Sequence, residues 1–130
     1  MTLQVTSGVL ATLREEAARA APEECCGLLL GQGETITEAR RADNVADNRL
    51  HRFEIDPMAL LSAHKAARAG GQQVLGYFHS HPQGHPVPSA TDCDHASGDD
   101  RVWAIVAGGE VAFWRDGEGG FSPVEWDEVD

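Results

Sequence analysis

The 130-residue sequence has few cysteines and no long apolar stretch, and each shortage excludes a class of protein. Its three cysteines, two of them adjacent at Cys25 and Cys26, cannot form a disulfide framework, and no Cys-x-x-Cys pair offers a thiolate zinc site. No uninterrupted apolar run approaches the ~20 residues of a membrane-spanning helix. The N-terminal segment has no basic start and becomes charged at residues 14–16, unlike a signal peptide. We therefore expect a cytoplasmic protein with no membrane partner.

Basic residues are also scarce. Ten Lys+Arg, of which only Lys65 is a lysine, stand against 21 Asp+Glu and leave a formal net charge of −11. Nucleic acids carry charge of the same sign, so we expect no nucleic-acid partner. The length fits one domain, and 42% hydrophobic with 24% charged residues is typical of a globular protein. The acidic run at 125–130 predicts a solvated tail, which places the domain at residues 1–124.

Hydrophobic periodicity and turn residues predict alternating strands and helices. Ser7 can cap the first helix, and Pro22 ends it. The predicted elements are, in chain order, a helix over 6–21, strands over 26–30 and 35–41, a helix over 57–69, a strand over 74–79, a short helix over 90–96, a hairpin of strands 102–107 and 111–114, and an edge strand over 121–126. This mixture indicates an α/β fold with a mixed sheet covered by helices.

The chemistry is concentrated in His79-Ser80-His81, which is followed after ten residues by Asp92. Residues i and i+2 of a strand point to the same face, so the two imidazoles project together. Asp92 falls in the first turn of the next predicted helix, and the loop between lets the chain reverse. Two histidines and a carboxylate leave a fourth position open, which is the arrangement of catalytic zinc sites, where zinc lowers the pKa of water toward 7.

A hydrolase of this design also needs a proton carrier and a donor to the oxyanion. Glu24, before the strand at 26–30, is a candidate general base, although spacing alone does not bring it to the metal. Ser89 is a candidate hydrogen-bond donor to the developing oxyanion. Ser89 and Asp92 also fit a helix capping box, Ser-x-x-Asp, which forms without any metal. An Asp92 that binds a metal could not at the same time serve fully as part of this cap.

Three segments together resemble the JAMM signature of MPN-domain (JAB-type) zinc peptidases: Glu24-Cys25-Cys26-Gly27-Leu28-Leu29, His79-Ser80-His81-Pro82 and Pro88-Ser89-Ala90-Thr91-Asp92. Phe53-Glu54-Ile55-Asp56-Pro57 also looks like bacterial members, and the likeness covers residues 7–115. The resemblance implies one MPN domain with a curved mixed sheet and cytidine-deaminase-like layering. It implies one zinc ion per chain held by His79, His81 and Asp92, with Glu24 as acid/base and Ser89 supporting the tetrahedral intermediate.

The same resemblance implies a substrate class. Compact prokaryotic members of the family act on ubiquitin-like proteins, including sulfur carriers, and cut after a C-terminal Gly-Gly. The short segments 42–52 and 82–88 leave little room for insertions that hold ubiquitin. We therefore expect a zinc peptidase or isopeptidase whose partner is a Gly-Gly-tailed carrier, with the tail added as a strand along a sheet edge.

Other functions stay open at this stage. A non-catalytic MPN scaffold would bind a protein partner and hold its metal only structurally. A zinc nucleoside deaminase shares the layering, but its His-x-Glu and Pro-Cys-x-x-Cys signature is missing. A cysteine nucleophile is the remaining rival, and we expect Cys26 to be a buried, inert thiol. His95, three residues after Asp92, could approach the site but is more often a surface residue.

Overall fold

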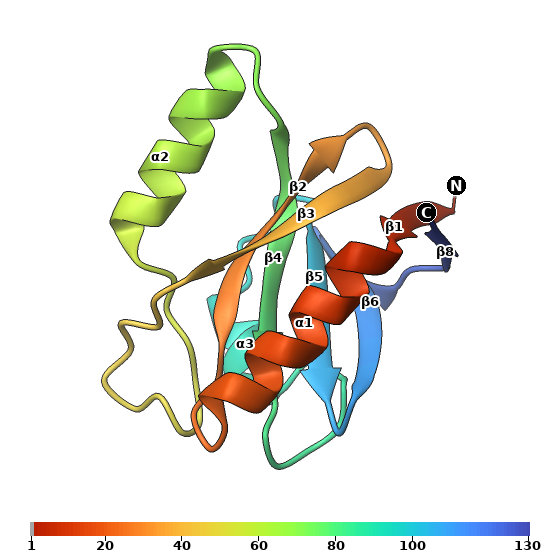
Figure 1. The fold of residues 1–130 in the computed structure, drawn as a ribbon. Helices are drawn as coiled ribbons and strands as arrows, with labels where there is room; N and C mark the ends of the chain where they lie inside the picture. The colour runs from red at the N-terminus through yellow and green to blue at the C-terminus, as the bar shows by residue number, and fades with distance from the viewer. Residues whose placement is uncertain (1) are drawn as a thin grey trace.

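One curved sheet contains all the named strands of residues 2–130, which the computed structural model describes (Figure 1). The strand order is β7-β6-β5-β4-β2-β3-β1-β8. The pairs β1–β3, β1–β8 and β4–β5 are parallel and the others antiparallel, so the sheet is mixed, as predicted. The strands are β1 (Leu3–Thr6), β2 (Cys26–Gln32), β3 (Thr35–Ala42), β4 (Gln73–Ser80), β5 (Val102–Ala107), β6 (Glu110–Gly117), β7 (Gly120–Pro123) and β8 (Trp126–Val129).

The three predicted helices form, as α1 (Ser7–Ala20), α2 (Pro57–Arg68) and α3 (Ala90–His95). The cap of α1 is Thr6 rather than the expected Ser7. Thr6 has extended backbone angles and its side chain accepts a hydrogen bond from the Val9 N–H, whereas Ser7 already lies in the helix. Asp56 caps α2 immediately before Pro57, as the Asp-Pro pair indicates.

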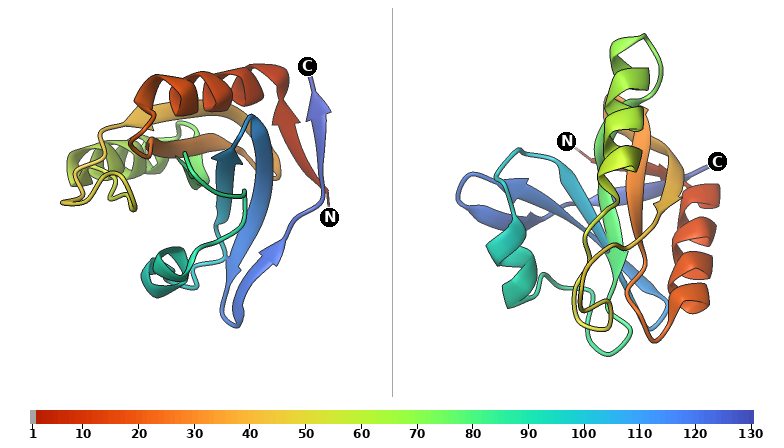
Figure 2. Two further views of the ribbon diagram at one scale, coloured as in Figure 1. Left: turned by 90° about the horizontal axis from the view of Figure 1, so that it is seen from below. Right: turned by 90° about the vertical axis from the view of Figure 1, so that its left-hand side faces the viewer.

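Helices cover both faces of the sheet. Leu10 and Leu13 of α1 pack with Leu29 and Phe78 on one face, whereas Ala63 of α2 packs with residues of the opposite face, Leu28, Leu30 and Val74. Figure 2 shows α3 on the other side of the sheet from α1. Because successive strand residues alternate between faces, His79 points away from α1, toward the side of α2 and α3. In the described part of the chain, no helix has the length and apolar character needed to cross a membrane.

The C-terminal segment differs from the prediction. The expected edge strand at 121–126 is two short strands, β7 beside β6 and β8 beside β1 at the far end of the sheet. The expectation of a solvated tail was therefore wrong for residues 126–129. Trp126 packs edge-on against Phe113, with ring centroids 5.1 Å apart, while Asp127 and Glu128 stay exposed. The acidic side chains face water, but the backbone belongs to the sheet.

Candidate metal centre

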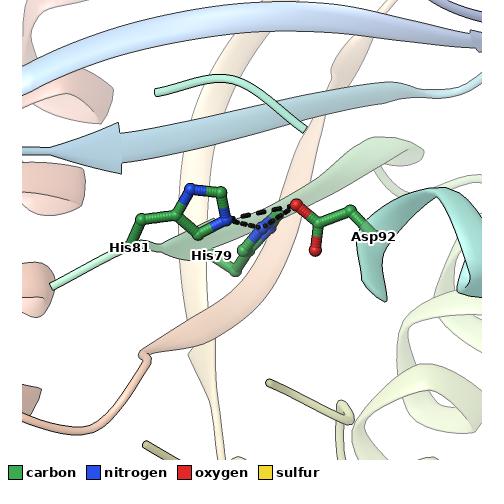
Figure 3. Close-up of side chains that lie close together, drawn as sticks. All are labelled: His79, His81 and Asp92. Atoms are coloured by element: carbon green, nitrogen blue, oxygen red, sulfur yellow. Dashed lines mark hydrogen bonds and ion pairs between the residues drawn. The ribbon is translucent and has the colours of Figure 1, made fainter. Parts of the chain in front are cut away.

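Three side chains meet at the end of β4 (Figure 3). The Nε2 atoms of His79 and His81 lie 3.1 Å apart, and the Oδ2 atom of Asp92 lies 3.0 and 3.1 Å from them. His79 is in β4, His81 follows its last residue, and Asp92 is in the first turn of α3. The sequence predicted that these three residues would converge at the carboxyl end of this strand, and they do.

The triangle of ligand atoms fits one zinc ion. Ligand atoms around a tetrahedral zinc, at the usual bond lengths of about 2.0–2.1 Å, are separated by about 3.3 Å. The His81 Nδ1 atom lies 2.8 Å from the carbonyl oxygen of His85 and must donate to it, because a carbonyl only accepts. In the neutral imidazole the lone pair is then on Nε2 and faces the Asp92 carboxylate. The His81 Nε2 atom and the Asp92 Oδ2 atom are both acceptors, and at 3.1 Å they need a cation between them.

The electrostatics of the three residues also favour one positive charge at this position. Burial lowers the pKa of His79 and keeps that ring neutral. Burial acts in the same direction on His81, but its hydrogen bonds to Asp92 and to the His85 carbonyl outweigh it and raise the pKa of His81. Burial opposes the ionisation of Asp92, yet its bonds to the two histidines hold the pKa of Asp92 well below its ordinary range. A metal ion takes the place of the proton that His81 otherwise holds.

Two aromatic rings fix the orientation of His79. Phe53 stacks on the imidazole with centroids 4.2 Å apart and planes inclined by 18°, and Trp103 meets it edge-on at 5.6 Å. His79 is fully buried between them, and its Nδ1 atom has no hydrogen-bond partner. This role of Phe53 was not predicted from the sequence, where Phe53 indicated only the likeness to bacterial family members. An aromatic residue shortly before the capped helix α2 was the available signal.

Strand pairing places Glu24 beside the metal ligands. In the antiparallel β2–β4 register Cys26 is opposite His79, and Cys25 and Ser80 are joined by two hydrogen bonds. The Cys25 N–H donates to the Ser80 hydroxyl at 2.9 Å, and the Ser80 N–H donates to the Cys25 carbonyl at 3.3 Å. Continuing that register brings Glu24 alongside His81. This pairing is the long-range information that the spacing of residues did not contain.

The Glu24 carboxyl group is buried without a hydrogen-bond partner for its Oε1 atom. The residue is 7% exposed, its Oε1 atom has no hydrogen-bond partner, and burial raises the pKa of Glu24 to about 7. It lines a cleft of about 520 Å³ together with His81 and Ser89. A carboxyl group with a pKa near neutrality can both accept and return a proton.

Asp92 belongs both to the capping box that it forms with Ser89 and to the metal triangle. The Ser89 hydroxyl accepts from the Asp92 N–H at 3.0 Å, and the Ser89 N–H donates to Asp92 Oδ2 at 3.0 Å. The same Oδ2 atom faces both imidazoles, so one carboxylate oxygen accepts the hydrogen bond of the cap and also lies at the candidate metal position. The hydroxyl hydrogen of Ser89 is not used by the cap, because the oxygen is the acceptor there.

The comparison with protein families agrees with the geometry. The family described as prokaryotic homologs of the JAB domain, Prok-JAB, matches residues 6–117. This chain belongs to the Prok-JAB family. The match covers the five candidate site residues, Glu24, His79, His81, Ser89 and Asp92.

The Prok-JAB chain is similar to two proteins named for cleavage. It is 39% identical over 101 residues to a desampylase of Haloferax volcanii, covering 76% of this chain and 73% of that protein. It is 34% identical over 129 residues to a probable TtuB-protein conjugate cleaving protease of Thermus thermophilus, covering 99% and 81%. The fold matches the crystal structure of a JAB1/MPN domain protein of Archaeoglobus fulgidus, with a TM-score of 0.64, 21% identity, and 97% and 98% of the chains covered. The predicted MPN fold is confirmed.

Other candidate residues of this Prok-JAB chain lie away from the chemistry or cannot perform it. His95 is exposed and lines a separate pocket with Phe53, Tyr77 and Trp103. Cys25 and Cys26 are both buried, and burial raises the pKa of both thiols, that of Cys26 to about 12. A thiol in that state is a poor nucleophile, which disfavours the cysteine mechanism.

Proposed function

We propose that the chain is a zinc metallopeptidase that hydrolyses the peptide or isopeptide bond after the C-terminal Gly-Gly of a ubiquitin-like or sulfur-carrier protein. The observation that carries the proposal is the buried, unbonded Glu24 carboxyl in the same cleft as His81 and Ser89. A structural metal would need the three ligands alone and would gain nothing from that carboxyl group. The names of the Haloferax and Thermus relatives support this substrate class.

Each residue has a proposed role. His79, His81 and Asp92 would hold the ion, which would supply Lewis acidity and lower the pKa of water toward 7. Glu24 accepts the proton of the attacking water and returns it to the leaving amine, which its raised pKa allows. Ser89 donates its unused hydroxyl hydrogen to the oxygen of the scissile carbonyl, where negative charge develops.

The walls of the cleft support an extended, slender substrate segment. Leu50 and His51 line the cleft from one connection, and Gly84, His85 and Val87 from another. Leu50 and Val87 are about half exposed and offer apolar contacts on both sides. A chain without side chains at its last two positions passes between such walls with the least steric conflict. Strand addition of this tail stays a prediction.

The setting of the protein is also a proposal. Two adjacent cysteines remain as free thiols, which agrees with a reducing compartment such as the cytoplasm. The net charge of −11 argues against a nucleic-acid partner.

The test uses carriers with an amino acid or peptide added after the tail. Zinc-loaded protein is incubated with matched carriers ending in Gly-Gly or Ala-Ala before the addition, and the products are weighed by mass spectrometry. We expect release after Gly-Gly, much slower release after Ala-Ala, and none after zinc removal by a chelator. Equal cleavage of both tails would contradict the proposed specificity, and no cleavage with zinc bound would favour a scaffold.

A further inference from the structure

We propose that Trp114 is a positioning residue for the metal ligand His81, acting through the loop at 82–88. The inference rests on the proposed function only in taking His81 as a zinc ligand. Trp114 lies in β6, and its side chain reaches this loop from the sheet.

A short series of hydrogen bonds connects the indole to the imidazole. The Trp114 Nε1–H donates to the carbonyl oxygen of Pro86 at 3.0 Å. The neighbouring carbonyl, that of His85, accepts from His81 Nδ1 at 2.8 Å and from the Val87 N–H at 2.8 Å. The Pro86 carbonyl and the Val87 N–H belong to one planar peptide unit, and this N–H donates to the His85 carbonyl. The indole bond therefore restricts the orientation of the His85 carbonyl through that unit.

The loop has little else to hold it. Residues 83–87 contain no helix or strand, and Gln83 to His85 lie near the surface. Among the hydrogen bonds of the described residues, the indole bond alone joins 83–87 to a strand. Trp114 itself is held firmly, since β6 is paired on both sides, with Trp103 of β5 and Pro123 of β7 opposite it. The sheet therefore anchors the loop through one side chain.

The hydrogen bond to the His85 carbonyl sets the tautomer and the ring orientation of His81. A carbonyl that accepts from Nδ1 selects the tautomer with its lone pair on Nε2, which is the form that binds a metal. It also holds the ring so that Nε2 stays 3.1 Å from both His79 Nε2 and Asp92 Oδ2. Without the indole bond, the His85 carbonyl is free to turn away, and His81 loses its preferred tautomer and ring position.

The matched experiment compares Trp114→Phe with Trp126→Phe. Both changes remove an indole and keep an aromatic ring, but Trp126 lies in β8, packs on Phe113 and makes no hydrogen bond to the loop among the described residues. Mutation of a direct hydrogen-bond partner of a metal-binding histidine typically changes metal affinity by about 10–100-fold. Trp114 acts on His81 through one further peptide unit, so we expect zinc to bind about 3–10-fold more weakly to Trp114→Phe. Competition with a chelator measures it, and Trp126→Phe should match the wild type.

Nuclear magnetic resonance supplies a readout that loss of stability would not produce. In the wild type and Trp126→Phe, the Hδ1 proton of His81 should exchange slowly with water, and in Trp114→Phe it should exchange faster. Zinc affinity and Hδ1 exchange equal to the wild type in Trp114→Phe would overturn the inference.

A wild-type measurement covers the case in which Trp114→Phe does not fold. Coupling between two sites is reciprocal, so zinc binding should slow exchange of the Trp114 indole proton and leave that of Trp126 unchanged. No effect of bound zinc on the Trp114 indole would overturn the inference. A wild type that binds no zinc would instead overturn the proposed function, so the two failures are distinguishable.

Discussion

Glu24 is the residue at which stability and chemistry conflict. Its folded pKa of about 7 lies above the ordinary 4.5, so the protonated form suits the fold. The resulting stability is fully present below pH 4.5 and is lost as the pH rises through 7. We therefore expect Glu24→Gln to raise the free energy of unfolding of the zinc-free protein by about 1–3 kcal/mol above pH 8, and by less at pH 5.

Denaturant unfolding at the two pH values checks this prediction. Glu15→Gln provides the control, because Glu15 is an exposed residue of α1. A gain in stability that does not depend on pH, or that appears equally in Glu15→Gln, would argue against a raised pKa at Glu24.

At the residue scale the sequence identified the metal ligands and missed their surroundings. His79, His81 and Asp92 could be predicted because a strand and a capped helix are local patterns, and local patterns set the direction of side chains. The position of Glu24 depends on the β2–β4 register, and the stacking of Phe53 on His79 depends on a loop returning to the sheet. Neither is encoded in nearby residues, so only family resemblance indicated the position of Glu24, and the stacking of Phe53 on His79 was not predicted.

At the N-terminus of α3, Ser89 is both the helix cap and the proposed donor to the oxyanion. Ser89→Ala removes the cap of α3, which costs about 1 kcal/mol, and the proposed oxyanion donor, which costs about 100-fold in kcat. Asp56→Ala removes the corresponding cap of α2 without touching the cleft. Steady-state kinetics and thermal unfolding should show similar destabilisation in both variants but a loss of kcat only in Ser89→Ala. If both variants lose kcat equally, Ser89 has only a structural role.

The elements themselves were predictable to different degrees. Long periodic helices and the apolar strands around β4 formed where expected, because burial of one face determines them. The hydrophobic pattern did not distinguish β7 from β8, because β8 has two exposed acidic residues between its half-buried Trp126 and Val129. Pairing with β1, at the opposite end of the chain, is what makes those residues a strand.

At the scale of the whole molecule, β8 links the end of the chain to its beginning. A chain ending at residue 124 would lose β8 and the Trp126–Phe113 contact, so we expect its free energy of unfolding to fall by about 2 kcal/mol or more. Thermal unfolding measures the change, with the double variant Asp127→Asn, Glu128→Gln as a control that removes charge but keeps the strand. Equal stability of the truncated and full chains would restore the view of residues 125–130 as a solvated tail.

Metal binding should be coupled to protonation and to stability. Because the pKa of His81 is raised, zinc must displace a proton from His81 at low pH, and affinity should increase as the pH rises through that value. Calorimetry in buffers of different ionisation enthalpy should find proton release that decreases as the pH rises through the raised pKa of His81. Zinc at 1,000 times its dissociation constant should add about 4 kcal/mol to stability. Zinc binding without proton release at low pH would contradict the electrostatic account of His81.

Single-turnover cleavage by Glu24→Gln tests whether the Glu24 carboxyl group carries the proton in this cleft. A Gly-Gly-tailed carrier conjugate is mixed with excess zinc-loaded protein, either wild type or variant, and both products are followed by intact mass. We expect Glu24→Gln to bind one zinc as the wild type does but to cleave at least about 100-fold more slowly, because general acid–base catalysis contributes about 10²–10⁴-fold. Equal rates for the two proteins would contradict the assignment of Glu24 as the proton carrier, and with it the mechanism proposed for this cleft.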